Sequence, residues 1–313
     1  MGKRLALNEQ QARGARRQQI GRLGRHRVER QVETRYLHHA WWLVQWMLAT
    51  GQSNIQSWLE MDMTLEEYIE MCWDKNLALS VATNTLSAVQ YFLKTKNCLK
   101  NSWKLISVWR MKEPPSRSPP LSFMMIRALA ALAVLEKDVG MAASLLAGFD
   151  AMLRTGEITD LVAGNVAFTN DGRAILSLGF TKGGKRRGTP EFGVIDSHST
   201  TLLLRTWLLN KPAGFHICGC SPAAWRVKFD QLLQRLNLNT RGYRPYSLRR
   251  GGATAFFLQT GRMDLVLERG RWNSTATAKL YINEGASLAC GETLSPALQG
   301  DLNGLASLWG SSL

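Results

Sequence analysis

Two segments near the end of this 313-residue chain decide its interpretation: Tyr246-Ser-Leu-Arg249-Arg250-Gly-Gly-Ala-Thr and Gly270-Arg271-Trp272-Asn-Ser-Thr-Ala-Thr-Ala-Lys-Leu-Tyr281. Their patterns predict helices over 246–259, 262–269 and 274–282, with Ser274 opening the last one. An arginine, an indole N–H and a tyrosine hydroxyl are thereby placed on three consecutive short elements.

Upstream of these segments, part of the sequence changes from a helical to an alternating period. Short strands are predicted over 165–168, 174–180 and 190–195, and Asn170-Asp171-Gly172 is typical of a hairpin turn between the first two. Helices are predicted over 122–136, 138–153, 197–209 and 221–236. The carboxyl-terminal part is therefore expected to be α+β, mostly helical with a small three-stranded antiparallel sheet.

The amino-terminal part is predicted to be a bundle of four short amphipathic helices, which makes the chain mainly α. They cover about 34–48, a stretch opened by the capping box Thr64-Leu-Glu-Glu67, about 82–95 and about 101–111. Tryptophans recur at helical spacing in these segments. They are therefore expected in the core rather than as stacking platforms for DNA bases.

Composition divides the chain into five parts. Residues 1–33 are a basic arm, expected to be flexible; 34–112 are the helical bundle; 113–121 form a proline-rich linker; 122–285 are the α+β domain; and 286–313 are a tail without Lys or Arg. Ten Lys or Arg against three Glu in residues 1–35 give +7, which favours phosphate contact. The alternatives for the arm are a solvated tail and an organelle transit peptide.

The overall charge of +15 and a pI of about 10.0 favour a polyanionic partner, nucleic acid first. No stretch is apolar enough to predict a membrane span. Five scattered cysteines are typical of reduced thiols, and His216-Ile-Cys218-Gly-Cys220 lacks partners at zinc-site spacing. We therefore predict no metal, no small-molecule cofactor and no membrane association.

Several side chains suit the transfer of a phosphoryl group. Arg154 and Arg249 each carry a planar, permanently charged fork that pairs with two phosphate oxygens. Lys182, on a glycine-rich turn, can give a proton to a leaving oxygen, with Lys185 as the substitute. Tyr281 is a nucleophile where neighbouring cations favour its phenolate. Taken singly, each also fits an ordinary role as a surface charge, a basic loop or a core aromatic residue.

The order and spacing of these motifs resemble the tyrosine recombinases, also called the phage integrase family, over about residues 34–285. Arg154-Thr-Gly-Glu157-Ile-x-x-Leu161 is similar to the first arginine box of that family, and Arg249 with the following Arg250-Gly-Gly-Ala-Thr is similar to the second. Lys182 matches the lysine on the second β-turn. Trp272 stands where the family has His or Trp, and Tyr281 follows it by nine residues, the interval of the nucleophile.

The resemblance implies a helical, SAM-like core-binding domain followed by a catalytic domain that acts on double-stranded DNA. It implies that Tyr281 attacks a phosphodiester and forms a 3′-phosphotyrosine, releasing a 5′-hydroxyl without metal or ATP. Arg154 and Arg249 would clamp the phosphate, Lys182 would protonate the leaving oxygen, and Trp272 would bind the phosphate or brace Tyr281. Glu157 would support Arg154. DNA contacts are expected from Lys185, Arg186, Arg187, Arg250 and Arg271.

Position 246 departs from the family pattern, which has His or Lys three residues before the second arginine. The hydroxyl of Tyr246 can donate a hydrogen bond to a phosphate oxygen, but it is neutral at pH 7 and cannot serve as a base. We include Tyr246 among the candidate catalytic residues, because every other position of the set carries suitable chemistry.

Three functions stay open at this point. They are a site-specific recombinase or integrase of a mobile element, acting as a tetramer on DNA; a DNA-binding protein that kept the fold and lost turnover; and a type IB topoisomerase. The apolar tail, 286–313, is expected to dock on a neighbouring protomer or to cover its own domain. An intracellular location with DNA is expected, in the nucleus of a eukaryote or the cytoplasm and nucleoid of a prokaryote.

Overall fold

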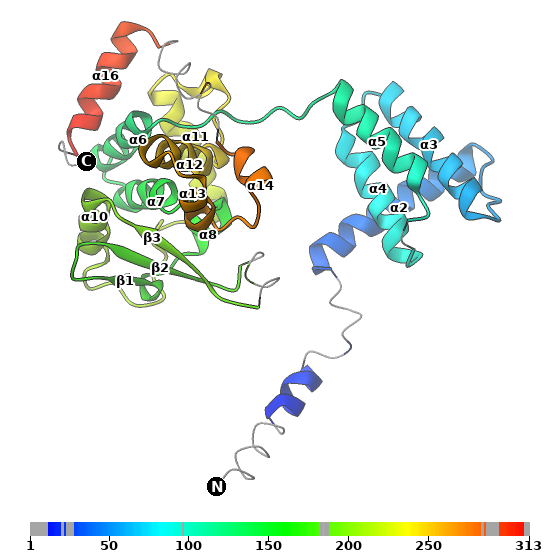
Figure 1. Cartoon of the computed structure of the whole chain (residues 1–313), viewed down its shortest axis with the longest axis horizontal. Helices are drawn as coiled ribbons and strands as arrows, with labels where there is room; N and C mark the ends of the chain where they lie inside the picture. Colours follow the sequence, from blue (N-terminus) through cyan, green and yellow to red (C-terminus); the bar gives the residue numbers. More distant parts are fainter. Residues whose placement is uncertain are drawn as a thin grey trace. The chain divides into compact units, whose positions relative to one another are not determined.

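The computed structural model describes residues 12–19, 22, 28–95, 97–181, 184, 188–282, 285 and 294–309. The chain divides into two compact units, Met1–Ser116 and Arg117–Leu313 (Figure 1). Each unit has its own cluster of buried apolar side chains. Among the described residues, no helix is both long enough and apolar enough to span a membrane.

The first unit is a helical bundle built from α2 (Arg30–Ala49), α3 (Trp58–Asp74), α4 (Leu79–Phe92) and α5 (Lys100–Lys112). Their apolar faces meet around Leu65, Ile69, Leu86 and Ile106. Residues 12–19 are helical, and 30–33 belong to α2, so these parts of the predicted arm have regular structure. Glu33 accepts a hydrogen bond from Tyr91 of α4 (3.0 Å), which ties the first turn of α2 to the bundle.

Helix α3 begins earlier than predicted. Its N-cap is Ser57, whose hydroxyl accepts a hydrogen bond from the Glu60 backbone N–H (3.2 Å). The predicted capping residue Thr64 lies inside the helix and is buried. The sequence therefore holds two Ser/Thr-x-x-Glu motifs in this stretch, and the first one is used. Asp62 caps a different helix: its carboxylate accepts from the backbone N–H groups of α5 residues Asn101 and Ser102, both at 3.0 Å.

The tryptophans of this unit do not all enter the core. Trp109 is 4% exposed, but Trp41, Trp42 and Trp58 are 54%, 51% and 44% exposed. The prediction of a core role is wrong for these three. Trp41 and Trp42 lie on α2, which packs mainly against α4 and turns its other face outward, and Trp58 is the first residue of α3. Helical spacing alone could not tell which face of α2 is covered.

The second unit combines helices with one sheet. Its elements in chain order are α6 (Phe123–Leu135), α7 (Val139–Asp150), α8 (Thr155–Asp160), β1 (Val166–Phe168), β2 (Ala174–Gly179), β3 (Glu191–Ile195), α10 (His198–Leu208), α11 (Pro222–Arg235), α12 (Tyr246–Thr260), α13 (Met263–Gly270), α14 (Thr275–Lys279) and α16 (Pro296–Ser307), with short 3₁₀ turns at Ala163–Asn165 and Asn239–Arg241. The strands pair antiparallel in the order β1-β2-β3, with Ala167 opposite Ile175 and Leu176 opposite Gly193. The predicted α+β fold with a three-stranded antiparallel sheet is confirmed.

Helix α12 closely approaches both α7 and the residues just before α6, and two consecutive glycines allow it. A Cβ atom on Gly251 would lie 2.1 Å from the carbonyl oxygen of Leu121, and one on Gly252 would lie 2.1 Å from that of Phe149. No side chain fits at either position. The close contact sets the nearby Arg249 against the segment that follows α7.

The tail helix α16 packs along α6 of its own unit (Figure 1). Leu302 is fully buried there, and the Trp309 indole N–H donates to the carbonyl oxygen of Arg127 (2.9 Å). The tail was expected either to dock on a neighbouring protomer or to cover its own domain, and in this structure α16 covers its own domain. Residues 286–293 and 310–313 of the tail lie outside the described residues.

Candidate active site

The predicted site residues come from four places in the second unit. Arg154 is the N-cap of α8, Tyr246 and Arg249 are in the first turn of α12, Trp272 follows α13, and Tyr281 follows α14. The structure brings these side chains into one cluster. Lys182, Lys185, Arg186 and Arg187 lie outside the described residues, so their predicted roles have no structural counterpart here.

Tyr281 lies at the centre of the cluster and is half-buried. The Tyr246 hydroxyl donates a hydrogen bond to the Tyr281 hydroxyl, and the two ring centroids are 5.3 Å apart. The ring of Trp272 packs against Tyr281 as well, with its centroid 4.5 Å from that of the tyrosine. The predicted nucleophile is therefore held by one hydrogen bond and two aromatic neighbours.

Arg249 lies against this aromatic group and is fully buried. Its guanidinium donates to the carbonyl oxygens of Met152 and Gly270, the latter at 2.5 Å. Its Cζ lies 4.6 Å from the ring centroid of Trp272 and 5.4 Å from that of Tyr281. Burial lowers the pKa of Arg249 to about 10, and the charges of Arg271 and Arg154 act in the same direction.

Arg154 and Arg271 are held by carboxylates. Glu157 accepts from the Arg154 backbone N–H (2.9 Å) and from its Nη1 (2.5 Å), and from Nη2 of Arg271 (2.8 Å). Burial alone would raise the pKa of Glu157, but the charge of Arg271, the Arg154 N–H and the charge of Arg154 outweigh it, so the pKa is lowered. The predicted support of Arg154 by Glu157 therefore has a direct geometric basis, and Glu157 joins Arg271 to the same network.

A second carboxylate, Glu191 at the start of β3, was not predicted. It is 3% exposed and lies 3.8 Å from Nη1 of Arg154 and 3.5 Å from Nε of Arg271. It also accepts a hydrogen bond (2.6 Å) from the hydroxyl of Thr181, which lies two residues after the end of β2. Glu191 thus ties the arginine network to the residue that precedes Lys182. No local motif marks it, because its role depends on strand register.

The two further arginines predicted to contact DNA are buried. Arg271 is 8% exposed, and its guanidinium is committed to Glu157, Glu191 and the carbonyl oxygens of Ala151 and Met152. The expectation of a DNA-facing Arg271 therefore does not fit this structure, in which it braces the site from within. Arg250 is 5% exposed, and its Nε has no hydrogen-bond partner among the described residues.

Orphaned donors gather around Tyr281. Within the described part of the chain, the buried Nε of Arg249, Nε of Arg250 and Nε1 of Trp272 have no hydrogen-bond partner. Buried donors are normally paired, and an unpaired one costs about 1–3 kcal/mol. Arg249 and Trp272 both pack against the Tyr281 ring, and such donors close together suit an oxygen-rich anion.

The protonation states follow from the same surroundings. Burial raises the pKa of Tyr246, and the hydrogen bond and charge of Tyr281 raise it further, so Tyr246 stays a neutral donor. Burial opposes the charge on Arg154, but Glu157 and Glu191 outweigh it, and a negative charge on Tyr281 adds to the net rise in its pKa. Negative charge on Tyr281 also favours the charged form of Arg249, against the stronger effect of burial on its pKa. Tyr281 and both predicted clamp arginines therefore share one electrostatic environment.

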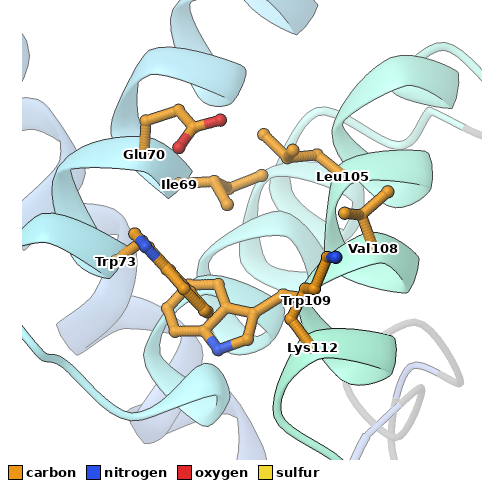
Figure 2. Close-up of a pocket in the computed structure, with 7 residues that line it drawn as sticks. All are labelled: Ile69, Glu70, Trp73, Leu105, Val108, Trp109 and Lys112. Carbon is orange, nitrogen blue, oxygen red and sulfur yellow. The ribbon is translucent and has the colours of Figure 1, made fainter.

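A pocket in the first unit carries none of this chemistry. It holds about 100 Å³ between α3 and α5 and is lined by Ile69, Glu70, Trp73, Leu105, Val108, Trp109 and Lys112 (Figure 2). Its walls are mostly apolar. The rings of Trp73 and Trp109 pack edge to face, with their centroids 5.2 Å apart. Among the described residues of the whole chain, no group of three or more His, Cys, Asp or Glu is placed to hold a metal ion.

No protein-family model matches the sequence, and no curated protein matches it either. Solved structures do match. The XerA recombinase is 17% identical over 87% of this chain and 94% of its own, with a TM-score of 0.45. The XerH site-specific recombinase in a pre-cleavage complex with its difH substrate is 15% identical over 70% of this chain and 66% of its own, with a TM-score of 0.48.

The integrase of transposon Tn1549, in complex with circular intermediate DNA, is 10% identical over 74% of this chain and 85% of its own, with a TM-score of 0.51. At this level of identity the likeness concerns the fold. The chain therefore has the fold of the tyrosine recombinases and integrases.

Proposed function

We propose that the chain is a recombinase or integrase that breaks and rejoins double-stranded DNA through a covalent bond between Tyr281 and a 3′ phosphate. The observation that carries this proposal is the packing of the Tyr281 ring against Arg249 and Trp272, each of which has a buried donor without a hydrogen-bond partner among the described residues. A phosphodiester would supply the acceptor oxygens that these buried donors lack. Recombination rather than another use of the fold is supported by the likeness in fold to a transposon integrase.

In the proposed reaction, Tyr281 gives its proton to water, and the phenolate oxygen attacks phosphorus as the bond from phosphorus to the 5′ oxygen breaks. Arg154 and Arg249 stabilise the charge on the non-bridging oxygens, the kind of preorganised interaction that dominates such reactions. We assign the proton for the leaving 5′ oxygen to Lys182. Tyr246 gives a hydrogen bond and no base, because its raised pKa keeps it protonated. Rejoining reverses these steps with a different 5′ hydroxyl.

The site must open before DNA can reach it. Arg249 is fully buried, and the rings of Tyr281 and Trp272 lie over its guanidinium. Tyr281 follows the short helix α14 (Thr275–Lys279), so we propose that this segment moves and uncovers Arg249 on the side where Tyr281 lies. The proposed cycle therefore begins with Tyr281 leaving Tyr246 as a phosphate takes its place. A tetramer on two duplexes, located with DNA in the cell, belongs to the same proposal.

The alternative is a DNA-binding protein that has the fold without turnover. It is favoured by one observation: the hydroxyl of Tyr281 is engaged by Tyr246, at the position where the resembled family has His or Lys. In that case the closed cluster would be permanent rather than a resting state.

A nicked duplex that traps the covalent intermediate separates these two functions. Duplexes would carry the DNA that flanks the coding sequence, and adducts would be resolved on a denaturing gel. We expect an adduct with the natural chain and none with Tyr281→Phe, which keeps DNA binding. Tyr243→Phe is the matched control, because it removes a buried hydroxyl of the same unit that contacts the sulfur of Met125. DNA binding without any adduct would establish the alternative.

A further inference from the structure

A stripe on α12 faces Tyr281. Tyr246, Arg250 and Thr254 are spaced by four residues and lie on one face of the helix. The Tyr246 hydroxyl donates a hydrogen bond to the Tyr281 hydroxyl. The Thr254 hydroxyl lies 3.5 Å from the Tyr281 carbonyl oxygen. Arg250, between them, therefore sits beside the same tyrosine.

Arg250 is a cation on this stripe that is buried. It is 5% exposed, and its guanidinium makes no hydrogen bond or ion pair with any residue that the structure describes. The neighbouring buried arginines differ, since Arg249 donates to two carbonyl oxygens and Arg271 is paired with Glu157. A buried charge is normally paired, and leaving it alone is strongly unfavourable.

A second cation lies next to it. Arg117, exposed at the start of this unit, has its Nη1 3.4 Å from the carbonyl oxygen of Leu280, the residue before Tyr281. Burial lowers the pKa of Arg250, and the charge of Arg117 lowers it further, so the two guanidinium groups repel each other. Two like charges beside one short segment form a ready site for an anion.

We infer that Arg117 and Arg250 form a second oxyanion site, which takes a DNA backbone phosphate next to the one attacked by Tyr281. This assignment rests on the proposed function for the identity of the anion, since the chemistry recognised is that of a phosphate group. Arg250 supplies a preorganised donor from the helix, and Arg117 closes over the phosphate from the surface. Binding there also draws Arg117 from the Leu280 carbonyl, at the end of the helix that precedes the nucleophile.

The salt dependence of DNA binding tests the site. Phosphate contacts do not depend on base sequence, so one duplex of fixed sequence serves with the full-length protein. The slope of log affinity against log salt falls in magnitude by about 0.9 for each phosphate that the protein no longer neutralises. We expect this reduction for Arg250→Gln and for Arg117→Gln. The double variant should show a reduction of about 0.9 rather than about 1.8, because both arginines hold one phosphate.

Arg235→Gln is the matched control, because Arg235 is an exposed arginine paired with Glu136 and should leave the slope unchanged. Arg250→Gln should unfold at the same temperature as the natural chain or higher, since it removes an unpaired buried charge. Unchanged slopes in both single variants would overturn the site. An additive reduction in the double variant would overturn the shared phosphate.

Inorganic phosphate distinguishes the source of the anion. If it raises the unfolding temperature of the natural chain but not of the double variant, while the DNA slopes stay equal, the site holds a small free anion and the DNA assignment is wrong. Failure of the proposed function gives a different pattern. Tyr281→Phe keeps the natural slope, so absence of the covalent adduct together with reduced slopes in Arg250→Gln and Arg117→Gln would reject catalysis and keep this site.

Discussion

The two halves of the candidate site differ in the groups that surround their arginines. Arg154 and Arg271 are paired with the carboxylates of Glu157 and Glu191. Arg249 has backbone carbonyls and aromatic rings around it, and in the described structure no carboxylate lies within ion-pairing distance of it. In the braced half, the carboxylates hold Arg154 in position for its proposed contact with the phosphate. In the other half, the Nε of Arg249 has no hydrogen-bond partner among the described residues and stays available to an incoming phosphate.

Removing the brace should have the largest effect. Glu157→Ala is expected to lower the free energy of unfolding by about 3 kcal/mol, because Arg271 is left buried with only the more distant Glu191. Chemical denaturation measures it. Asp171→Ala is the control: it breaks an exposed pair with Arg173 and should change the free energy of unfolding by less than about 1 kcal/mol. Equal losses of stability in the two variants would show that the carboxylate network is not structural.

The unpaired half should respond in activity more than in stability. Trp272→Phe keeps an aromatic ring beside Arg249 and removes the orphaned N–H together with part of the indole ring. We expect covalent adduct formation to slow by about a hundredfold, with a loss of stability of about 1–2 kcal/mol from the smaller ring. Trp207→Phe is the matched control, because its indole N–H donates to the Ile217 carbonyl oxygen (2.9 Å) and its removal should affect stability alone. A destabilised Trp272→Phe with normal adduct formation would contradict the comparison.

The smallest effect concerns the contact that closes the unpaired half. Burial and Tyr281 raise the pKa of Tyr246, so its stabilising contribution is fully present below the usual tyrosine pKa of about 10 and is lost as pH rises through the folded value. Tyr246→Phe should remove a contribution of about 1 kcal/mol. Thermal unfolding at neutral and alkaline pH would show the natural chain losing its advantage over the variant above about pH 10. A constant difference between them at all pH values would show that Tyr246 is not the titrating group.

Much of the fold was predictable because its signals are local. The β1–β2 hairpin follows from Asn170-Asp171-Gly172, where Gly172 has a φ of +86°, and Ser274 caps α14 as its spacing indicates. Helix α3 shows the limit of such signals, because two capping motifs compete and only packing selects Ser57. The exposed Trp41 and Trp42 show the same limit, since periodicity predicts an apolar face of a helix but not what packs against that face.

The site was predictable in its membership and not in its accessibility. Arg249, Arg250 and Arg271 are alike in sequence, yet one donates to carbonyl oxygens, one has no partner among the described residues and one is clamped by carboxylates. These differences arise from elements far apart in the chain, such as β3 with Glu191 and the segment with Arg117. Local patterns identify residue types suited to a chemistry, whereas tertiary contacts decide which atoms stay free.

The complete burial of Arg249 gives the protein a built-in reporter of its own opening. Dicarbonyl reagents modify only guanidinium groups that they can reach, so Arg249 should escape them in the free protein while exposed arginines such as Arg262 are modified. Peptide mapping of the labelled protein would then time the uncovering of this one side chain independently of any DNA cleavage. A resting enzyme and a permanently closed protein would both protect Arg249 from the reagent in the absence of DNA. Once a duplex is added, Arg249 would become modified in the first and stay protected in the second.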